Sequence, residues 1–583
     1  MKFKIITHCL LKLYLLFFPT FTIPNTTIQS LSQSTTTIDV NRDLIKLKIS
    51  KTNLKANDST IDAGPILEKV AYYAQAHQIR NITVPKGNYY FKTIRNNAHL
   101  NIKMINNLSI KGVDANFFFY NRYAKGILIE SCNSFNIEGI NLDYKYDLPF
   151  SSGIITGIEN NTISFNQFKN RPVTDFNNEK EAHKVWIFVL RKSADGVKYI
   201  TSRMSSETSI LQGGKVTVTD KDNNNLSKIN KNDIICFSDR SLTANHALCI
   251  VNYYPNIGDH NSIKNINIYS SPAMGVAAKW QKYFSVSNVT VKPLETREQY
   301  ISTNADGIDI ANGGLGNSIK NCHTKMTGDD GISYYCGLMG KIVSANQNSI
   351  KVYLKYILSA GQEITIANAN NLQETDHVII KSISRLAEQC PETGFEGVYN
   401  INIDNKILDI PINSQLFLAE KDRMPGVSAQ FNTVEQSYAR GIFVAGVTNS
   451  EINNNLINET NSSAILIQRI NESGNGMKSA TCSNINIHDN INNKIFTWGI
   501  SYQTGAIEAA IMRPKNMSIE VYHKAIKIKN NTISIADNGN KHIGIFLSNI
   551  SKYAISDNTV KYFDNKLNLP PSNKKMVLEN CNE

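Results

Sequence analysis

Short runs of alternating apolar and polar residues recur along most of this chain. Examples are NNLSIKG (106–112), NSIKNINIY (261–269), NSIKNCHTKM (317–326) and CSNINIHDNI (482–491). Each run contains a period-2 strand, an Asn-containing turn and a second short strand. One supersecondary unit that returns at a spacing of roughly 20–30 residues is typical of a solenoid, whereas the strands of a sandwich rarely repeat one motif. The pattern predicts an all-β fold, specifically a right-handed parallel β-helix.

The stretch from Asp62 to Phe91 changes its pattern halfway. Its first half places apolar residues at helical spacing, and its second half contains the strand-like NITV followed by a Pro-Lys-Gly turn. A helix before the first coils would cover the open end of the stack, which is otherwise an unpaired edge. We therefore expect a helical N-terminal cap whose buried face carries Ile66, Leu67, Val70, Ala71 and Ala74.

Two stretches interrupt the repeat and carry longer apolar strands, such as VWIFVL in the first and HVIIKSISR in the second. Solenoid turns tolerate insertions, so both stretches are expected to form small β-barrel-like domains. The second begins soon after Asp329–Asp330, and we expect it to overhang those acids. The predicted organisation is a signal peptide (1–23), a leader (24–60), the cap and first coils (61–150), an inserted β domain (151–240), central coils with an acidic site (241–339), a second inserted domain (340–432), C-terminal coils (433–565) and a tail (566–583).

The first residues, MKFKIITHCLLKLYLLFF, combine two early lysines with an apolar run. This is typical of a secretory signal peptide and predicts a secreted or periplasmic protein, with a retained membrane anchor as the alternative. The net charge is +12, from 61 basic and 49 acidic residues. The basic residues are scattered rather than clustered, so no nucleic-acid partner is expected. Nine cysteines contain no C-x-x-C pair, which argues against a zinc ribbon.

Acidic residues stand next to apolar strand residues in two motifs, STNADGIDI (302–310) and TGDDGISYY (327–335). Asp330 follows Asp306 by 24 residues, about one coil, so their side chains should be neighbours at the strand spacing of roughly 4.8 Å. Crowded carboxylates shift one another's pKa values apart and so provide a proton donor and a base. Glycoside hydrolysis requires that combination. A calcium site and a structural Asn/Asp ladder remain alternatives.

The two motifs resemble the N-x-D…D-D core of the polygalacturonase-like β-helix hydrolases, glycoside hydrolase family 28. A closer resemblance is to the α-1,3-galactosidases of glycoside hydrolase family 110, within the same wider superfamily. It covers roughly residues 60–530. It depends on SSPAMGVAAKWQKYFSVSNVTVKP (270–293), REQYISTNADGIDI (297–310), NCHTKMTGDDGI (321–332) and YARGIFVAGVTNSEINNNLINETNSSAILIQRINESG (438–474).

The resemblance implies that Asp306, Asp329 and Asp330 are catalytic, with Asp329 as the acid and the other two on the side of the base. It also implies that Arg297 and Arg440 line the substrate site. Asp309 is expected to bind or support the substrate, and Trp280 to stack on a sugar. No metal or cofactor is expected. An inverting reaction would hold acid and base roughly 6.5–9.5 Å apart, with a water between them.

The sequence therefore predicts a secreted glycoside hydrolase that removes terminal α-linked galactose-type residues from a glycan or polysaccharide. Two alternatives stay open. One is a calcium-dependent polysaccharide lyase or uronate-acting enzyme, for which the scattered Lys and Arg would suit an acidic polymer. The other is a catalytically inactive carbohydrate-binding surface protein that keeps the solenoid.

Overall fold

The computed structural model describes residues 36–583 except 170–184, 195, 202–203, 207–214, 220–225, 240–241, 243, 253–257, 369–372, 393–394, 405–409, 470, 473–475, 478, 498–504, 512–521, 537–541, 564–575 and 582–583. The predicted signal peptide (1–23) lies outside the described residues. No helix among the described residues is long and apolar enough to cross a membrane. The eight cysteines of the described part, all those after Cys9, form no disulfide with one another.

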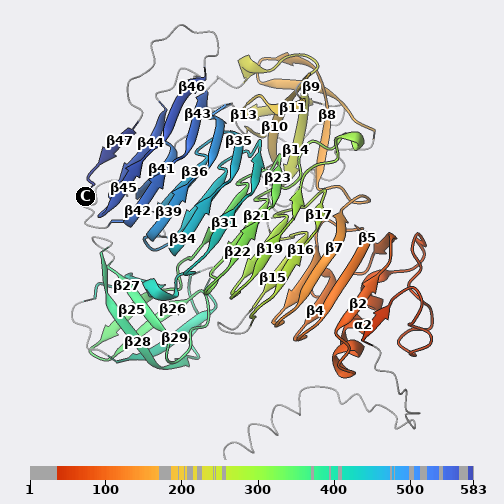
Figure 1. Ribbon diagram of the computed structural model, residues 1–583, viewed down its shortest axis with the longest axis horizontal. Helices are drawn as coiled ribbons and strands as arrows, with labels where there is room; N and C mark the ends of the chain where they lie inside the picture. Colours follow the sequence, from red (N-terminus) through yellow and green to blue (C-terminus); the bar gives the residue numbers. More distant parts are fainter. Residues whose placement is uncertain are drawn as a thin grey trace, which may run out of the picture. The chain divides into compact units, whose positions relative to one another are not determined.

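The body of the chain is a right-handed parallel β-helix, as the sequence predicts. Most coils contribute two consecutive strands to a 21-stranded sheet, called sheet A here, and one strand to an 11-stranded sheet, called sheet B. Figure 1 shows these strands stacked in chain order, from red-orange at the first coils to blue at the last. Because all neighbours are parallel, each strand repeats the register of the strand one coil earlier.

The strands of sheet A are β1 (Thr37–Asp39), β2 (Asn81–Val84), β3 (Gly87–Phe91), β5 (Ser109–Phe119), β7 (Asn136–Asp143), β16 (Ser262–Lys264), β17 (Asn267–Ile268), β19 (Ser285–Ser287), β20 (Thr290–Val291), β22 (Ser318–Lys320), β23 (His323–Lys325), β31 (Ser428–Gln430), β32 (Thr433–Glu435), β34 (Thr448–Asn453), β35 (Leu456–Thr460), β39 (Ser483–His488), β40 (Ile491–Ile495), β42 (Lys524–Lys529), β43 (Thr532–Ala536), β45 (Tyr553–Ser556) and β46 (Thr559–Phe563).

The strands of sheet B are β4 (Ala98–Lys103), β6 (Lys125–Glu130), β15 (Leu248–Val251), β18 (Val276–Lys279), β21 (Ile308–Ala311), β24 (Ile332–Tyr335), β33 (Ile442–Ala445), β36 (Ile465–Arg469), β41 (Gly505–Ile511), β44 (Ile543–Ser548) and β47 (Met576–Glu579). One strand of each sheet lies where the sequence predicted no strand. β47 belongs to sheet B although 566–583 was expected to be a tail, and β1 pairs with β2 although 24–60 was expected to be a leader.

The interior of the coils is filled by the aliphatic residues of the period-2 strands. Ile308, Ile332, Ile442 and Ile465 occupy one register position on successive strands of sheet B, and each is fully buried. Helix α2 (Ala63–Ala76) covers the first coils, with Leu67, Val70, Ala71 and Ala74 buried and Ile66 only partly so. Asp62 caps this helix by accepting a hydrogen bond from the Gly64 backbone N–H.

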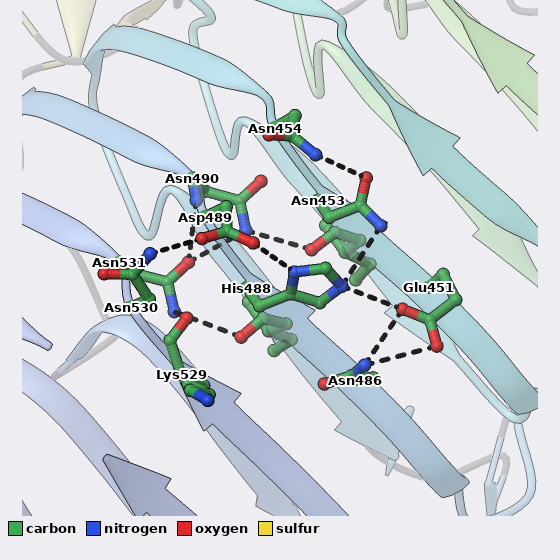
Figure 2. A network of polar contacts seen from close by, with 12 residues as sticks. Glu451, Asn453, Asn454, Asn486, His488, Asp489, Asn490, Lys529, Asn530 and Asn531 are labelled. Carbon is green, nitrogen blue, oxygen red and sulfur yellow. Dashed lines mark hydrogen bonds and ion pairs between the residues drawn. The ribbon is translucent and has the colours of Figure 1, made fainter. Parts of the chain in front are cut away.

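The recurring Asn residues have two distinct roles in the turns inside sheet A. The first residue of each turn has a positive φ, such as 54° at Asn454 and 56° at Asp489, a conformation that Asn and Asp tolerate. The second is a buried Asn that links one coil to the next. The Asn455 backbone N–H donates to Asn490 Oδ1 at 3.0 Å, and the Asn490 backbone N–H donates to Asn531 Oδ1 at 3.0 Å. Figure 2 shows part of this ladder beside His488.

The two insertions leave the solenoid at opposite edges of sheet B. The first follows a strand of sheet A and precedes β15, so it lies at the N-terminal edge of sheet B. It contains β8 (Phe150–Glu159), β9 (Thr162–Gln167), β10 (Val185–Ser193), β11 (Gly196–Tyr199), β12 (Met204–Ser206), β13 (Lys215–Thr219) and β14 (Ile234–Asp239). They form an antiparallel sheet in which β10 pairs with both β12 and β14, which closes the strand order on itself.

The second insertion follows β24 and therefore lies at the C-terminal edge of sheet B. Its strands form a closed barrel in the order β25 (Gly340–Asn346), β26 (Ser349–Leu354), β29 (Gly397–Ile403), β28 (Glu374–Arg385), β27 (Glu363–Ala367) and β30 (Gln415–Leu418). The solenoid resumes earlier than the predicted boundary at 432, because β31 already pairs with β22 of sheet A.

Candidate active site

The two acidic motifs lie one above the other at the N-terminal edge of sheet B. β21 and β24 pair in the register Ile308↔Ile332, so Asp306 and Asp330 occupy the same position on successive coils. The Asp330 backbone N–H donates to Asp306 Oδ1 at 3.1 Å. One carboxylate oxygen from each of Asp306, Asp329 and Asp330 lies within 4.8 Å of the others. The spacing in the sequence therefore predicted this cluster correctly.

Asp306 and Asp330 are each followed by a glycine, because successive coils approach one another closely at this position. A Cβ on Gly307 would lie 2.6 Å from the Gly331 carbonyl oxygen, and one on Gly331 would lie 2.8 Å from the Gly441 carbonyl oxygen. Real Cβ atoms do not approach backbone oxygen this closely without displacing it. The Asp-Gly steps thus hold the chain in a tight turn that stacks the preceding carboxylates.

Burial and mutual repulsion determine which of these groups carries a proton. Asp306 is only 8% exposed, and its pKa lies well above the usual value because of burial and the neighbouring charges of Asp330 and Asp329. Burial also raises the pKa of Asp330, to about 6, against the opposing effect of Arg440. Burial and the neighbouring carboxylates thus favour the protonated form of Asp306 over its ionised form more than at an ordinary carboxyl. The assignment of Asp329 as the acid stays a prediction.

Arg440 joins the cluster from the next coil, as the resemblance implied. Its Nε lies 2.5 Å from Asp330 Oδ1 and its Nη2 lies 2.6 Å from Asp330 Oδ2, a bidentate pair, and Asp329 Oδ1 is 3.8 Å away. The guanidinium also lies over the ring of Phe443 at 4.4 Å. One side of Asp330 is thus neutralised, while Asp329 keeps 27% of its side chain exposed. Asp329 is the most accessible carboxylate of the three.

Asp309 lies on β21, on the outward face of sheet B, three residues after Asp306. It is 1% exposed, and burial raises its pKa to about 7, opposed by a hydrogen bond from Ser333 and by the charge of Lys279. Its Oδ1 has no hydrogen-bond partner within the described part of the chain. An unsatisfied buried oxygen costs free energy unless a ligand donates to it, which is the arrangement a substrate hydroxyl would complete.

Sequence reasoning missed Ser333, Lys279 and Tyr335 around Asp309. Ser333 is the register partner of Asp309 on β24, and Lys279 and Tyr335 occupy the next outward position of β18 and β24. Burial and the nearby Asp309 raise the pKa of Tyr335 well above its usual value. The parallel register itself would have revealed these residues, because outward positions align once a single pair has been fixed.

The two other predicted site residues, Arg297 and Trp280, have partners outside the carboxylate cluster. Arg297 lies on a short 3₁₀ helix, η3 (Glu295–Arg297), and its Nη1 pairs with Asp143 Oδ2 at 2.5 Å. Trp280 directly follows β18, so it lies at the C-terminal edge of sheet B, away from the acids. Its ring is 8% exposed and packs in the core of the barrel, edge-on to Tyr356 at 5.3 Å.

The first insertion contacts all three turns that carry the charged groups. Ser238 of β14 hydrogen-bonds Asn304, two residues before Asp306. Tyr199 of β11 donates from its hydroxyl to the Thr327 carbonyl oxygen at 3.2 Å, two residues before Asp329. Tyr438, two residues before Arg440, packs against Phe188 and Tyr199 at ring distances of 5.0 and 5.8 Å.

These contacts correct the expectation that the second insertion covers the acids. The acids precede their strands and so lie at the edge where the first insertion leaves the coil. The second insertion approaches from the other edge, where Tyr356 influences Tyr335 beside Asp309. The outward face of sheet B around Asp309 therefore lies between the two insertions.

The carboxylate cluster also has the composition of a cation site, since hard cations prefer carboxylate oxygens. However, the Arg440 guanidinium already engages both oxygens of Asp330 at 2.5–2.6 Å. A cation at that carboxylate would have to displace the arginine or share the oxygens with it. The donor set thus fits a proton-transfer site better than a calcium site.

The oxygens are closer than the inverting arrangement predicted from the sequence. A separation within 4.8 Å is less than the roughly 6.5–9.5 Å expected for an inverting acid and base. It is a span that one water can bridge with two hydrogen bonds of about 2.8 Å each. These are the nearest oxygens of the three carboxylates, so the predicted separation of the acid and base groups during an inverting reaction stays a prediction.

No family model and no curated protein matches the chain. Among solved structures, the endo-xylogalacturonan hydrolase from Aspergillus tubingensis is similar at 11% identity over 90% of this chain and 93% of that chain, with a TM-score of 0.40. An exopolygalacturonase from Thermotoga maritima is similar at 10% identity over 93% and 91%, with a TM-score of 0.39. A GH87 α-1,3-glucanase from Streptomyces thermodiastaticus is similar at 9% identity over 96% and 70%, with a TM-score of 0.37. Similarities at TM-scores this low assign neither a fold nor an activity to the chain.

Proposed function

We propose that the chain is a glycoside hydrolase that acts through Asp306, Asp329 and Asp330. The observation that carries the proposal is the carboxylate cluster, in which one oxygen from each residue lies within 4.8 Å of the others and the pKa of Asp306 is raised well above its usual value by burial and the neighbouring acids. Three carboxylates with a single arginine cannot all stay ionised in a desolvated site, so the cluster combines a proton donor with an ionised base.

In the proposed reaction Asp329 delivers the proton, because it is the most exposed carboxylate and can reach the glycosidic oxygen. Asp306, whose pKa is raised by burial and the neighbouring acids, passes a proton to Asp329 within the cluster. Asp330, kept ionised by Arg440, removes a proton from a water whose oxygen attacks the anomeric carbon as the glycosidic C–O bond breaks. The reaction consumes one water and releases the free sugar and the rest of the glycan, each with a hydroxyl group where the glycosidic bond was.

The finer proposal is a substrate with terminal α-linked galactose-type residues, by resemblance of residues 270–293, 297–310, 321–332 and 438–474 to family 110. The unsatisfied Asp309 Oδ1 supports a hydroxyl-rich substrate, because a sugar hydroxyl would supply the missing donor. Asp309, Ser333 and Lys279 would then contact the sugar beside the cluster. The predicted signal segment would take such an enzyme to the cell exterior or the periplasm.

The test is hydrolysis of a panel of aryl α- and β-glycosides by the full-length protein, with and without EDTA. We expect release of the aryl group from an α-galactoside, unaffected by EDTA. Asp329→Asn and Asp330→Asn should each lower kcat at least about a hundredfold. Asp114→Asn, at a carboxylate 76% exposed on the first coils, is the matched control and should change little.

Other outcomes would identify other functions. Activity that EDTA abolishes, with an unsaturated product from a uronate polymer, would indicate a calcium-dependent lyase. Full activity of both cluster variants would end the catalytic assignment. Absence of any hydrolysis would leave a carbohydrate-binding protein. The anomeric configuration of the first product, measured by proton NMR, would report the stereochemistry.

A further inference from the structure

A second cleft lies at the C-terminal edge of sheet B, between the solenoid turns and the barrel. Its volume is about 820 Å³, in the range of small-molecule sites. The solenoid contributes the turns that carry Trp280, Tyr283 and Gly313–Gly314, and the barrel contributes Gly361 and Gln362. Strand β21 separates Asp306 from Asn312 at this cleft, so the two sites lie about 13–20 Å apart, from four strand residues to six residues of chain at roughly 3.3 Å each. One monosaccharide cannot occupy both sites.

The two walls of the cleft are fixed to one another. Trp280, from the solenoid, packs inside the apolar core of the barrel. Arg423, where the chain returns from the barrel, is 1% exposed and pairs with Glu374 of β28 at 2.9 Å. Glu374 Oε1 also accepts hydrogen bonds from the backbone N–H and the hydroxyl of Thr481, a solenoid residue, both at 2.9 Å. A buried network of this kind keeps the cleft preformed.

Tyr283 lines the solenoid side of the cleft, and the ring of His260, which follows the lining residue Asp259, stacks on it. The rings of Tyr283 and His260 lie 4.8 Å apart and are nearly parallel at 23°. Tyr283 is 43% exposed, and the His260 side chain is 63% exposed. Gly316, at a φ of +75°, leaves room beside the tyrosine ring, since a Cβ there would lie 2.6 Å from Tyr283 Cδ1. The stack is therefore held in place and is accessible to solvent.

The charges in the cleft compensate one another. The lining carries two acids, Asp259 and Asp422, and two lysines, Lys282 and Lys421. Lys421 and Lys282 both act on Asp422 and oppose the rise in its pKa that burial causes. No excess of either sign is left for a polyanion. The chemistry is that of an uncharged, hydroxyl-rich ligand, which hydrogen-bonds to paired polar groups and lays an apolar face on an aromatic surface.

We propose that this cleft is a second binding site for a neutral glycan, which holds a polymer about 13–20 Å from the carboxylate cluster. The choice of ligand class rests on the proposed function, since a polymer held here would present its branches to the enzyme. The stack of Tyr283 on His260 carries the contact with the sugar face. Trp280, predicted to bind substrate, then contributes to this cleft as part of its wall and not to the acid site.

The test uses the full-length protein with Asp330→Asn, so that no hydrolysis occurs during the measurement. Native gels contain increasing amounts of galactomannan, a neutral polymer with terminal α-galactose, or of polygalacturonate. We expect galactomannan to retard the protein more than polygalacturonate does. Adding Tyr283→Ala or His260→Ala should weaken galactomannan binding at least tenfold.

The matched control is Phe431→Ala, which removes an aromatic ring that is 56% exposed at a φ of 57° on another solenoid turn, outside the cleft. It should bind galactomannan like its parent. His260→Ala guards against misfolding of Tyr283→Ala, because an exposed ring can be removed with little effect on folding. Stronger retardation by polygalacturonate, no retardation by galactomannan, or unchanged binding by both cleft variants would each overturn the proposal. Failure of the proposed function shows separately, as an unmutated protein that hydrolyses no glycoside.

Discussion

Replacing Asp309 with Asn should make the protein more stable, and increasingly so as the pH rises. The folded protein holds the pKa of Asp309 at about 7, against 3.8 for the ordinary carboxyl, because the side chain is 1% exposed. The folded state thus binds this proton more tightly than the unfolded chain does. The contribution of Asp309 to stability is fully present below about pH 4 and is lost as the pH rises to 7.

The magnitude follows from the two pKa values. A difference from 3.8 to about 7, at about 1.4 kcal/mol per pH unit, gives about 4 kcal/mol between pH 4 and pH 8 as an upper bound. Asn keeps the shape of Asp but cannot ionise, so Asp309→Asn removes the pH dependence of stability that the ionisation of Asp309 causes. The stability of the variant relative to the parent should therefore rise by up to about 4 kcal/mol over this range.

The measurement is urea denaturation of the full-length parent and variant at pH 4, 6 and 8, followed by circular dichroism. Asp114→Asn is the control, because its exposed carboxylate should leave the pH dependence of stability unchanged. A stability difference for Asp309→Asn that is the same at all three pH values would refute the reasoning. It would mean that Asp309 is ionised without cost in the folded protein.

Three further changes test other parts of the structure. Arg440→Met removes the charge that lowers the pKa of Asp330, so the acid limb of the kcat/KM profile should move to higher pH by at least about one unit; an unmoved limb would contradict the pairing. Tyr199→Phe and Ser238→Ala loosen the first insertion from the acid-bearing turns, and each should lower kcat about tenfold with KM nearly unchanged, as steady-state kinetics would show. A rise in KM alone would speak against a positioning role. Asn490→Ala leaves buried backbone groups of the Asn ladder without partners and should cost about 2–3 kcal/mol in urea denaturation; a cost below about 0.5 kcal/mol would show that the ladder is dispensable.

The β-helix could be predicted because its determinants are local and repeated. Alternating apolar residues select strands, Asn selects the turns, and the 24-residue spacing places Asp330 on Asp306 once the register is parallel. Arg440 is separated from Asp330 by the whole second insertion, so only the resemblance suggested it. Its place in the cluster then follows from the strand pairing of β24 with β33.

The sequence could not reveal at which edge of sheet B a given side chain lies. Trp280 and Asp306 are close in sequence to strands of the same sheet, but one follows its strand and the other precedes it. Nothing in the alternation of β18 or β21 reveals this difference until the direction of each strand is known. The contacts of the first insertion are also long-range: Ser238 reaches Asn304 across 66 residues. Such contacts depend on how a closed sheet docks, which short-range patterns do not encode.

One register position at the edge of sheet B, two residues before the aligned Val276, Ile308, Ile332, Ile442 and Ile465, is occupied on successive coils by Met274, Asp306, Asp330, Arg440 and Ser463. A purely structural ladder at this position would use small or apolar residues, as the coils on either side do. Instead, carboxylates are buried here at a cost that a single arginine only partly offsets, and burial raises the pKa values of Asp306 and Asp330. Natural sequences bury charged or incompletely hydrogen-bonded groups mainly at functional sites. A shifted pKa together with a defined charge partner is typical of such sites. The free-energy cost of burying these carboxylates is confined to two coils, whose turns the first insertion contacts. The other coils of the solenoid therefore keep their regular apolar packing, although this edge of sheet B holds buried acids.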